Sequence, residues 1–213
     1  MVNIAVLVSG GGTNLQALID AVEAGQINGH ITLVVASKPG VFALERAARH
    51  GIPSRVVRRA DYADPAAFEQ ALLTALHDAG TDLVVLAGYL SILGRAVTDA
   101  YRGRMINVHP SLIPSFCGPG YYGLRVHEAA LSYGVKVTGA TVHFVNEVTD
   151  GGAIILQKAV EVRQGDTAEA LQQRVMRQAE WEILPRAVAL FCDGRLEWTD
   201  DGKVIINEQG EQE

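Results

Sequence analysis

Two side chains that could stabilise developing negative charge lie two residues apart in the segment MINVHP, residues 105–110. If residues 104–108 form a strand, Asn107 and His109 share one face of it, about 6.7 Å apart along the chain. An amide beside an imidazole at the end of a parallel strand suits an oxyanion, because the amide stabilises the charge and the imidazole donates or relays a proton. A single histidine near a strand end is more often structural. The pairing of Asn107 with His109, followed at once by Pro110, is what favours catalysis.

A glycine-rich loop near the start of the chain could bind an anion. Residues 9–14 read SGGGTN and stand between an apolar segment and a helical pattern. At the carboxyl ends of parallel strands, glycines let the main chain approach an anion, and the helix N-terminus offers free N–H groups. The loop matches neither a dinucleotide fingerprint, because Leu15 stands where a third glycine is needed, nor a Walker loop, which requires Gly-Lys-Ser/Thr. The alternative is a tight turn with helix capping by Thr13 or Asn14.

Other catalytic chemistries find little support among the remaining polar residues. No G-x-S-x-G elbow is present, and Ser111 follows His109 without forming a recognisable triad. Cys117 lies in a glycine-rich loop with no assigned base, which favours an inert thiol. His109, His127 and His143 are well separated, with no H-E-x-x-H and no cysteine pair, so we expect no metal site. We interpret His143 as a residue packed behind the site.

The elements that must position these residues alternate between strand and helix. Apolar, β-branched segments predict strands, and apolar residues at helical spacing predict helices between them. Up to residue 110 we expect strands at 3–8, 31–36, 54–57, 82–86 and 104–108, a helix that carries residues 15–22 and ends at Gly25, and further helices at 41–48, 66–79 and 92–101. Beyond it we expect a loop at 115–123, a helix at 124–132, strands at 136–145 and 153–162, a helical segment at 168–189 that Pro185 kinks or breaks, a hairpin at 194–206 and a frayed tail at 208–213. This order indicates one α/β domain with a mostly parallel twisted sheet, helices on both faces and antiparallel strands in the C-terminal part.

Composition and charge narrow the class of protein. The chain has 213 residues, 48% hydrophobic and 20% charged, which is the usage of a globular domain. A net charge of −6 argues against a general nucleic-acid binder or a membrane-surface protein, although main-chain amides can still bind an anionic substrate. Two cysteines cannot form a disulfide scaffold, and no apolar stretch approaches the roughly 20 residues of a membrane span. The short apolar start lacks a basic segment, so we expect a cytoplasmic protein without a signal peptide.

Asp150 precedes two glycines in a turn between two long strands, where an aspartate is by itself an ordinary turn residue. Five segments together change that interpretation: IAVLVSGGGTNLQALI, VVLAGYLSIL, INVHPSLIPSF, HEAAL with YGVKVTGATVHFV, and TDGGAIILQ. With them, the chain strongly resembles the phosphoribosylglycinamide formyltransferase family, folate-dependent enzymes of purine synthesis, from about residue 2 to about residue 195. The Asn-x-His-Pro-Ser-Leu segment is typical of the wider formyltransferase superfamily, and the Ser-Gly-x-Gly-x-Asn-Leu loop narrows the resemblance to this family.

The resemblance implies a role for each matching residue. Asn107, His109 and Asp150 correspond to the catalytic trio, in which Asp150 holds His109 and raises its pKa by favouring the imidazolium. The ribotide phosphate and ribose are expected at Gly11, Gly12, Thr13, Asn14 and Glu180. The folate is expected at Leu90, Ser91, Ile92, Leu93, Asn107, Asn146, Glu147, Val148, Thr149 and Asp150, largely through main-chain groups.

The chain departs from the family pattern at four places. Ser91 stands where arginine is common, Pro65 replaces an often basic residue near the folate tail, and Ala153 replaces the usual proline of the turn. The loop at 115–123 is several residues longer than in the best-known members. We expect its tyrosines to form a lid, a subunit contact or plain surface.

The fold implied by the resemblance is the Rossmann-like formyltransferase fold, as a single domain over residues 1–213. Its parts are a phosphate-binding half at about 1–100, a folate-binding and catalytic half at about 101–195, and a C-terminal hairpin and tail at 196–213. The implied reaction is direct transfer of the formyl group of 10-formyltetrahydrofolate, as co-substrate, to the amine of N1-(5-phospho-D-ribosyl)glycinamide in purine synthesis, with no metal and no covalent enzyme intermediate. We expect small-molecule substrates, no nucleic acid or membrane, and a monomer or homodimer.

Three alternatives stay open at this point. A methionyl-tRNA formyltransferase shares the Asn-x-His chemistry but needs a basic C-terminal domain, for which this acidic end leaves no room. A formyltetrahydrofolate hydrolase shares the trio but usually carries an additional N-terminal domain, whereas here the first strand is expected at residue 3. A non-enzymatic nucleotide-binding module would need only the glycine loop.

Overall fold

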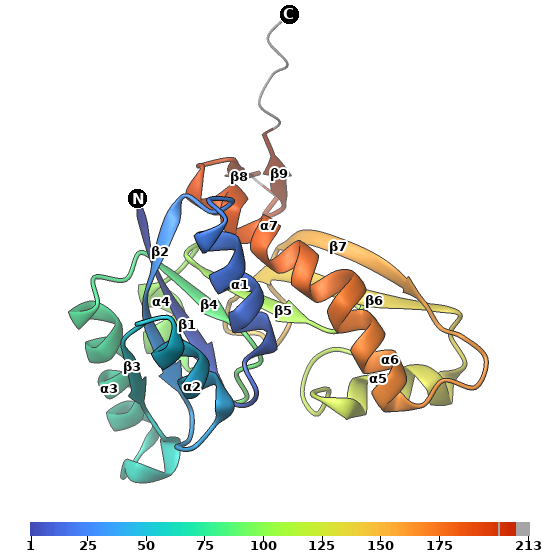
Figure 1. Cartoon of the computed structure of the whole chain (residues 1–213), viewed down its shortest axis with the longest axis horizontal. Coiled ribbons are helices and arrows are strands. Elements are labelled where there is room, and N and C mark those ends of the chain that lie inside the picture. Colours follow the sequence, from blue (N-terminus) through green and yellow to red (C-terminus); the bar gives the residue numbers. More distant parts are fainter. Residues whose placement is uncertain (200, 208–213) are drawn as a thin grey trace, which may run out of the picture.

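A seven-stranded sheet in the order β3-β2-β1-β4-β5-β6-β7 forms the centre of the molecule (Figure 1). The structure is a computed structural model that describes residues 1–199 and 201–207; the tail at 208–213, expected to fray, lies outside the described residues. The strands are β1 (Val2–Val8), β2 (Gly29–Ala36), β3 (Ser54–Val56), β4 (Leu83–Leu86), β5 (Met105–His109), β6 (Val137–Phe144) and β7 (Ile154–Glu161). The pairs from β3 to β5 are parallel, and β6 and β7 join antiparallel. The predicted fold class is confirmed.

Helices cover both faces of this sheet, as expected. They are α1 (Thr13–Glu23), α2 (Phe42–Arg49), α3 (Pro65–Asp78), α4 (Arg95–Ala100), α5 (Leu124–Tyr133), α6 (Ala168–Val175) and α7 (Trp181–Cys192), with short irregular helices η1 (Arg59–Asp61) and η2 (Met176–Glu180) and a hairpin of β8 (Leu196–Trp198) and β9 (Val204–Ile206). One apolar cluster joins α1, α2, α6 and α7 to one side of the strands, and a second joins α3 and α4 to the other. Successive residues of β1 enter the two clusters in turn, which is why the strand is apolar at every central position. None of the described helices is both long and apolar enough to cross a membrane.

Two expectations about helices need correction. The helix expected at 92–101 is shorter, because Gly94 precedes its first residue and the residues before it form a loop after β4. The helix is not broken at Pro185, which lies inside α7; the irregular part of this helical segment is the π-type turn η2 before α7. A proline ring crowds the carbonyl four residues before it, here that of Trp181, and the wide π-type turn directly before Trp181 accommodates the irregularity.

The strand order creates an opening at the carboxyl edge of the sheet. β1 lies between β2 and β4; the chain leaves β1 into α1 on one face and leaves β4 into α4 on the other. Where connections diverge in this way, a crevice opens between the loops and ligands bind there. The glycine loop, the loop after β4 and the end of β5 therefore meet at one edge.

Candidate active site

A cleft of about 770 Å³ opens at this edge, a usual size for a small-molecule site. Every residue that the sequence assigned to catalysis or to a substrate lines it. Its walls come from the glycine loop, residues 86–93, the end of β5, residues 118–123 of the long loop with its two tyrosines, His127, His143, residues 145–150, and part of the segment from α6 to η2. The structure thus brings together segments from both halves of the chain.

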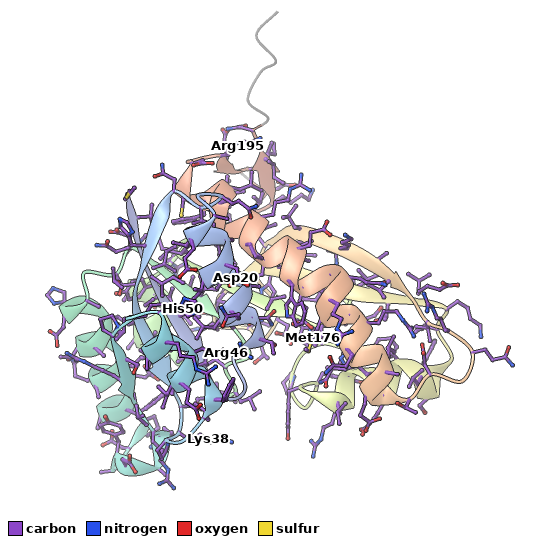
Figure 2. The ribbon with its side chains drawn as sticks, in the orientation of Figure 1. Asp20, Lys38, Arg46, His50, Met176 and Arg195 are labelled. Atoms are coloured by element: carbon purple, nitrogen blue, oxygen red, sulfur yellow. The ribbon has the colours of Figure 1, made fainter. Side chains whose placement is uncertain are left out.

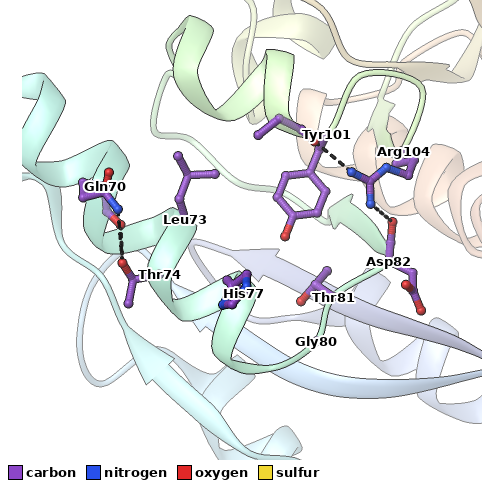
Figure 3. A pocket seen from close by; sticks show the side chains of 10 residues that line it. Gln70, Leu73, Thr74, His77, Gly80, Thr81, Asp82, Tyr101 and Arg104 are labelled. Carbon is purple, nitrogen blue, oxygen red and sulfur yellow. Dashed lines mark hydrogen bonds between the residues drawn. The ribbon is translucent and has the colours of Figure 1, made fainter.

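A second hollow of about 680 Å³ lies at the opposite end of β4, between α3 and α4 (Figure 3). None of the predicted site residues lines it. Its arginine, Arg104, already donates to the main-chain carbonyls of Asp82 and Ala100, at 3.3 and 2.9 Å. The candidate chemistry therefore belongs to the cleft at the carboxyl edge.

Asp150 and His109 face each other in the cleft although they come from different segments. The distance from Nδ1 of His109 to the Asp150 carboxylate is 3.5 Å, and both side chains are at most a tenth exposed. Asp150 adopts a left-handed backbone, with φ of 54°, directly before Gly151. Few residues without a glycine's freedom take this conformation, and aspartate is among those that tolerate it.

The long loop at 115–123 contacts this pair through its main chain. The Nε2 atom of His109 donates to the carbonyl of Phe116 at 2.9 Å, and the amide of Gly118 donates to Asp150 at 2.8 Å. Phe116 also has a positive φ, of 49°. Sequence reasoning missed these contacts, because a loop carbonyl or amide leaves no signal in residue type.

His143, expected to pack behind the site, is buried in β6 but also lines the cleft, with its Nε2 3.8 Å from the Asp150 carboxylate. It is the partner of Asn107 in the register of β5 and β6. Its Nδ1 donates to the carbonyl of Phe144 at 2.8 Å, which leaves Nε2 to accept the Asn107 amide at 3.1 Å. His143 therefore fixes the orientation of the Asn107 amide.

Burial and charge act against each other on the central pair. Burial lowers the pKa of His109 more than the Asp150 carboxylate raises it, so the pKa ends below its ordinary value. The expectation that Asp150 leaves the His109 pKa raised is therefore wrong for the net shift, although the carboxylate acts in that direction. Burial raises the pKa of Asp150, but the neighbouring His143, His109 and Gly118 amide outweigh it and leave the pKa below the usual range. At neutral pH the site thus holds a carboxylate beside a neutral imidazole.

The glycine loop opens α1 towards the cleft without a side-chain cap. Gly12, at φ 71°, is the residue before the helix, and no side chain caps the helix N-terminus. The alternative of capping by Thr13 or Asn14 is wrong, because Thr13 is already helical and Asn14 turns to Glu180. The first N–H groups of α1 are therefore left without a side-chain partner at the cleft.

Asn14 and Glu180 form a buried polar pair beside this loop. The Asn14 amide donates to the Glu180 carboxylate at 2.7 Å, and its own oxygen is buried without a partner among the described residues. Glu180 comes from η2, so the wide turn aims it into the cleft. Burial raises the pKa of Glu180 to about 7, against the smaller opposing effect of the Asn14 hydrogen bond.

The wall assigned to the folate presents exposed apolar side chains. Ile92 is 86% exposed, and Leu90 and Val148 are each more than half exposed. Such a patch on a cleft wall is typical of a surface that a ligand covers.

Of the positions at which the sequence departs from the family pattern, Ser91 lines the cleft, whereas Pro65 is the first residue of α3 and does not. The carbonyl of Ala153 accepts from the amide of Phe144 at 2.9 Å, which closes the turn without a proline.

Two further titratable side chains, those of His127 and Cys117, lie at or near the cleft. His127 of α5 lines the cleft, is fully buried, and has no partner for either ring nitrogen among the described residues; burial lowers its pKa to about 4. Its spacing from the other site residues carried no signal. The pKa of the Cys117 thiol is raised by burial and by Asp150, which agrees with an inert thiol. Within the described residues, no three of His, Cys, Asp or Glu are placed to hold a metal ion.

Comparison with known proteins places this arrangement in a family. The formyl transferase family model matches residues 2–188. The phosphoribosylglycinamide formyltransferase of Haemophilus influenzae is 39% identical over 210 residues, which cover 96% of each chain. The trifunctional purine biosynthetic protein adenosine-3 of Bos taurus is 44% identical over 201 residues, and the match spans only 19% of that longer protein.

Comparison with solved structures points to the same family. Glycinamide ribonucleotide transformylase 1 from Symbiobacterium toebii superposes with a TM-score of 0.92 at 42% identity, covering 98% of this chain and 95% of that one. A formyltetrahydrofolate deformylase from Pseudomonas syringae is more distant, at 26% identity and a TM-score of 0.86, with 66% of its chain covered. This chain belongs to the phosphoribosylglycinamide formyltransferase family.

Proposed function

We propose that this protein transfers the formyl group of 10-formyltetrahydrofolate to the amine of N1-(5-phospho-D-ribosyl)glycinamide, a step of purine biosynthesis. The observation that carries the proposal is one cleft with three chemically distinct parts. A glycine loop at a helix N-terminus suits a phosphate, an exposed apolar wall suits a flat ring system, and Asn107, His109 and Asp150 line the same cavity.

The ribotide end rests on the glycine loop and on the pair beside it. The uncapped amides of α1 are donors for a phosphate, and the unused oxygen of Asn14 and the carboxylate of Glu180 are acceptors for ribose hydroxyls. These groups are costly to leave unsatisfied in a buried site. A polar ligand at this position repays that cost.

The wall with exposed apolar side chains supports the proposed folate site. The exposed side chains of Leu90, Ile92 and Val148 offer apolar surface, and the residues between them offer main-chain donors and acceptors. Folate supplies the activated formyl group as the co-substrate. This chain's part is to bind the flat rings, to exclude water from them and to present the formyl group to the trio.

The transfer then needs stabilisation of one charge and movement of one proton. The amine nitrogen attacks the formyl carbon, negative charge develops on the formyl oxygen, and the bond from that carbon to the folate nitrogen breaks. The Asn107 amide and the Nε2–H of His109 donate hydrogen bonds to that oxygen. When the His109 ring accepts a proton, Asp150 stabilises the positive charge on the ring. A proton leaves the amine and ends on the folate nitrogen. Holding both reactants in one cleft supplies much of the rate.

In the free protein the single N–H of the neutral His109 ring, at Nε2, donates to the carbonyl of Phe116, and Nδ1 faces the Asp150 carboxylate at 3.5 Å. Donation to the formyl oxygen requires that one of these contacts be exchanged for the substrate. The contact exchanged is the one with Phe116, because Nε2 carries the hydrogen, while Nδ1 stays beside Asp150, which stabilises an imidazolium.

One assay distinguishes transfer from hydrolysis, the reaction of the deformylase alternative. The purified protein is given 10-formyltetrahydrofolate with and without glycinamide ribotide, and formate and formylated ribotide are measured separately. Transferase function predicts tetrahydrofolate release that depends on ribotide and matches formylated product one to one. Equal rates of formate release in both reactions would identify a hydrolase instead.

We also propose a location, an oligomeric state and a domain organisation for this protein. A cytoplasmic location and a monomer or homodimer acting on small molecules can be tested by fractionation and by analytical ultracentrifugation. A single domain with a phosphate-binding half and a catalytic half can be tested by limited proteolysis, which should yield no stable half.

A further inference from the structure

The cleft offers no full positive charge to the anion that we place in it. Among the described residues, its wall carries the carboxylates of Glu147, Asp150 and Glu180 and no lysine or arginine. The amides of the glycine loop and the helix N-terminus supply only partial charges. A phosphate dianion at the glycine loop, close to the acidic side chain of Glu180 and in a chain of net charge −6, calls for a cation from behind the wall.

Arg46 of α2 lies in that position, behind the glycine loop and next to α1 (Figure 2). Its Nε–H donates to the carbonyl of Gly11 at 2.9 Å, and its Nη1–H donates to Gln16 of α1 at 2.9 Å. No carboxylate of the described residues forms a salt bridge with it. The positive charge of Arg46 is therefore directed at the loop.

The contact with Gly11 acts on the peptide that carries the amide of Gly12. In a trans peptide the carbonyl and the following N–H point in opposite directions, so a carbonyl held by α2 turns the amide of Gly12 away from α2. The amide of Ala43 holds the preceding carbonyl, that of Gly10, at 3.2 Å in the same way. A guanidinium on the carbonyl also polarises the peptide and makes its N–H a stronger donor.

We infer that Arg46 is a positioning residue for the phosphate of the substrate, because it fixes and polarises the Gly11–Gly12 peptide from outside the cleft. The inference rests on the proposed function, which places the ribotide phosphate at this loop. Arg46 itself does not line the cleft, and its effect is transmitted through one peptide unit.

The test compares glycinamide ribotide with its dephosphorylated nucleoside as amine substrates. For Arg46→Ala we expect kcat/KM for the ribotide to fall roughly 10-fold or more, the value of a charge-assisted hydrogen bond. The kcat/KM for the nucleoside and the KM for formylfolate should change by less than about 2-fold, since neither involves the phosphate. Arg46→Lys keeps the charge and should recover part of the loss, whereas Arg46→Gln should not.

Arg49 provides a matched control on the same helix. Its guanidinium lies 5.2 Å from the centre of the Phe42 ring, against 4.9 Å for Arg46, and it pairs with Glu45 without touching the loop. Arg49→Ala should leave both kcat/KM values unchanged. Equal losses for ribotide and nucleoside in a folded Arg46 variant, or rescue by glutamine as complete as by lysine, would overturn the inference.

The variant Asn14→Ala distinguishes a failure of this inference from a failure of the proposed function. If Asn14→Ala and Arg46→Ala both leave the ribotide KM unchanged, the ribotide does not bind at this loop and the proposed site is wrong. If Asn14→Ala raises the ribotide KM and the Arg46 variants do not, only the role of Arg46 is wrong. Thermal melting accompanies each variant, and Arg46→Lys and Arg46→Gln carry the comparison if the alanine variant does not fold.

Discussion

His109 is held between burial, which lowers its pKa, and the Asp150 carboxylate, which raises it. The net result is an imidazole that is neutral at neutral pH and lies 3.5 Å from a charged carboxylate. Such a group can take a proton during the reaction and be stabilised once it has done so. The carboxylate therefore limits how far burial depresses the His109 pKa.

Replacing Asp150 with asparagine should expose this balance. Asp150→Asn removes the charge at nearly constant size, so the pKa of His109 should fall further below its ordinary value. Lost stabilisation of the imidazolium should reduce kcat by about 10² to 10⁴. Histidine titration by NMR and the pH dependence of kcat measure the two effects. An unchanged titration together with an unchanged kcat would reduce Asp150 to a turn residue.

The glycine loop packs closely against α2. A Cβ on Gly12 would lie 2.7 Å from the Cβ of Ala43, and the φ of Gly12 is 71°, so both space and backbone require glycine there. A Cβ on Gly11 would meet nothing within 4 Å. Two neighbouring glycines of the same loop thus differ in what they tolerate.

This difference gives a matched pair of variants. Gly12→Ala should push the loop away from α2 and raise the ribotide KM by roughly 10-fold or more, whereas Gly11→Ala should have a clearly smaller effect. The KM for formylfolate should change little in either. Steady-state kinetics with each substrate varied in turn measures both. A larger ribotide effect from Gly11→Ala would contradict this packing.

The loop at 115–123 should act on the catalytic pair through one amide. Gly118 and Gly120 have similar φ values, 88° and 93°, so proline strains the backbone at both, but only Gly118 donates to Asp150. Gly118→Pro should raise the pKa of Asp150 and move the acidic limb of the kcat profile to higher pH, because it removes a hydrogen bond that stabilises the carboxylate. Gly120→Pro serves as the control for strain. The same shift in both variants would show that loop strain, not the amide, is responsible.

At the scale of the whole molecule, Glu180 makes folding depend on pH. Its pKa is about 7 in the folded chain against 4.5 for an ordinary glutamate, so the folded state binds a proton more tightly than the unfolded state. The stability that this proton contributes is full below pH 4.5 and is lost as the pH rises to about 7. The loss amounts to roughly 3 kcal/mol of unfolding free energy.

Glu180→Gln should remove this dependence. Urea unfolding at several pH values should show the wild-type free energy of unfolding falling between about pH 4.5 and pH 7, and a smaller fall in the variant. Exposed Glu182, on the next helix, gives the control substitution Glu182→Gln, which should keep the wild-type slope. Parallel curves for wild type and Glu180→Gln would mean that burial does not shift this carboxyl.

Most of the elements, the fold class and the family could be predicted from the amino-acid sequence. Apolar periodicity predicts a strand or a helix from neighbouring residues alone, and these segments are long enough to carry it, as in 3–8 and 66–79. Asn107 and His109 could be paired because they are two residues apart on one strand. Periodicity does not define where an element ends, which is why α4 and the irregular turn at η2 differ from the expected helices.

The surroundings of those residues depend on long-range packing, so they could not be predicted from the sequence. The antiparallel register sets the end of β6 beside the start of β5, and the loop that follows β6 runs back along the cleft, so that Asp150 reaches His109 at the other end of β5 and both are buried. The carbonyl of Phe116 and the amide of Gly118 contact the catalytic pair, Arg46 contacts the glycine loop, and His127, without a partner among the described residues, lines the same cleft. Main-chain groups are the same in every residue, and the net pKa of His109 depends on burial, which is a property of the packed chain. Local pattern therefore specified the parts, while long-range packing set the charges and contacts that the chemistry uses.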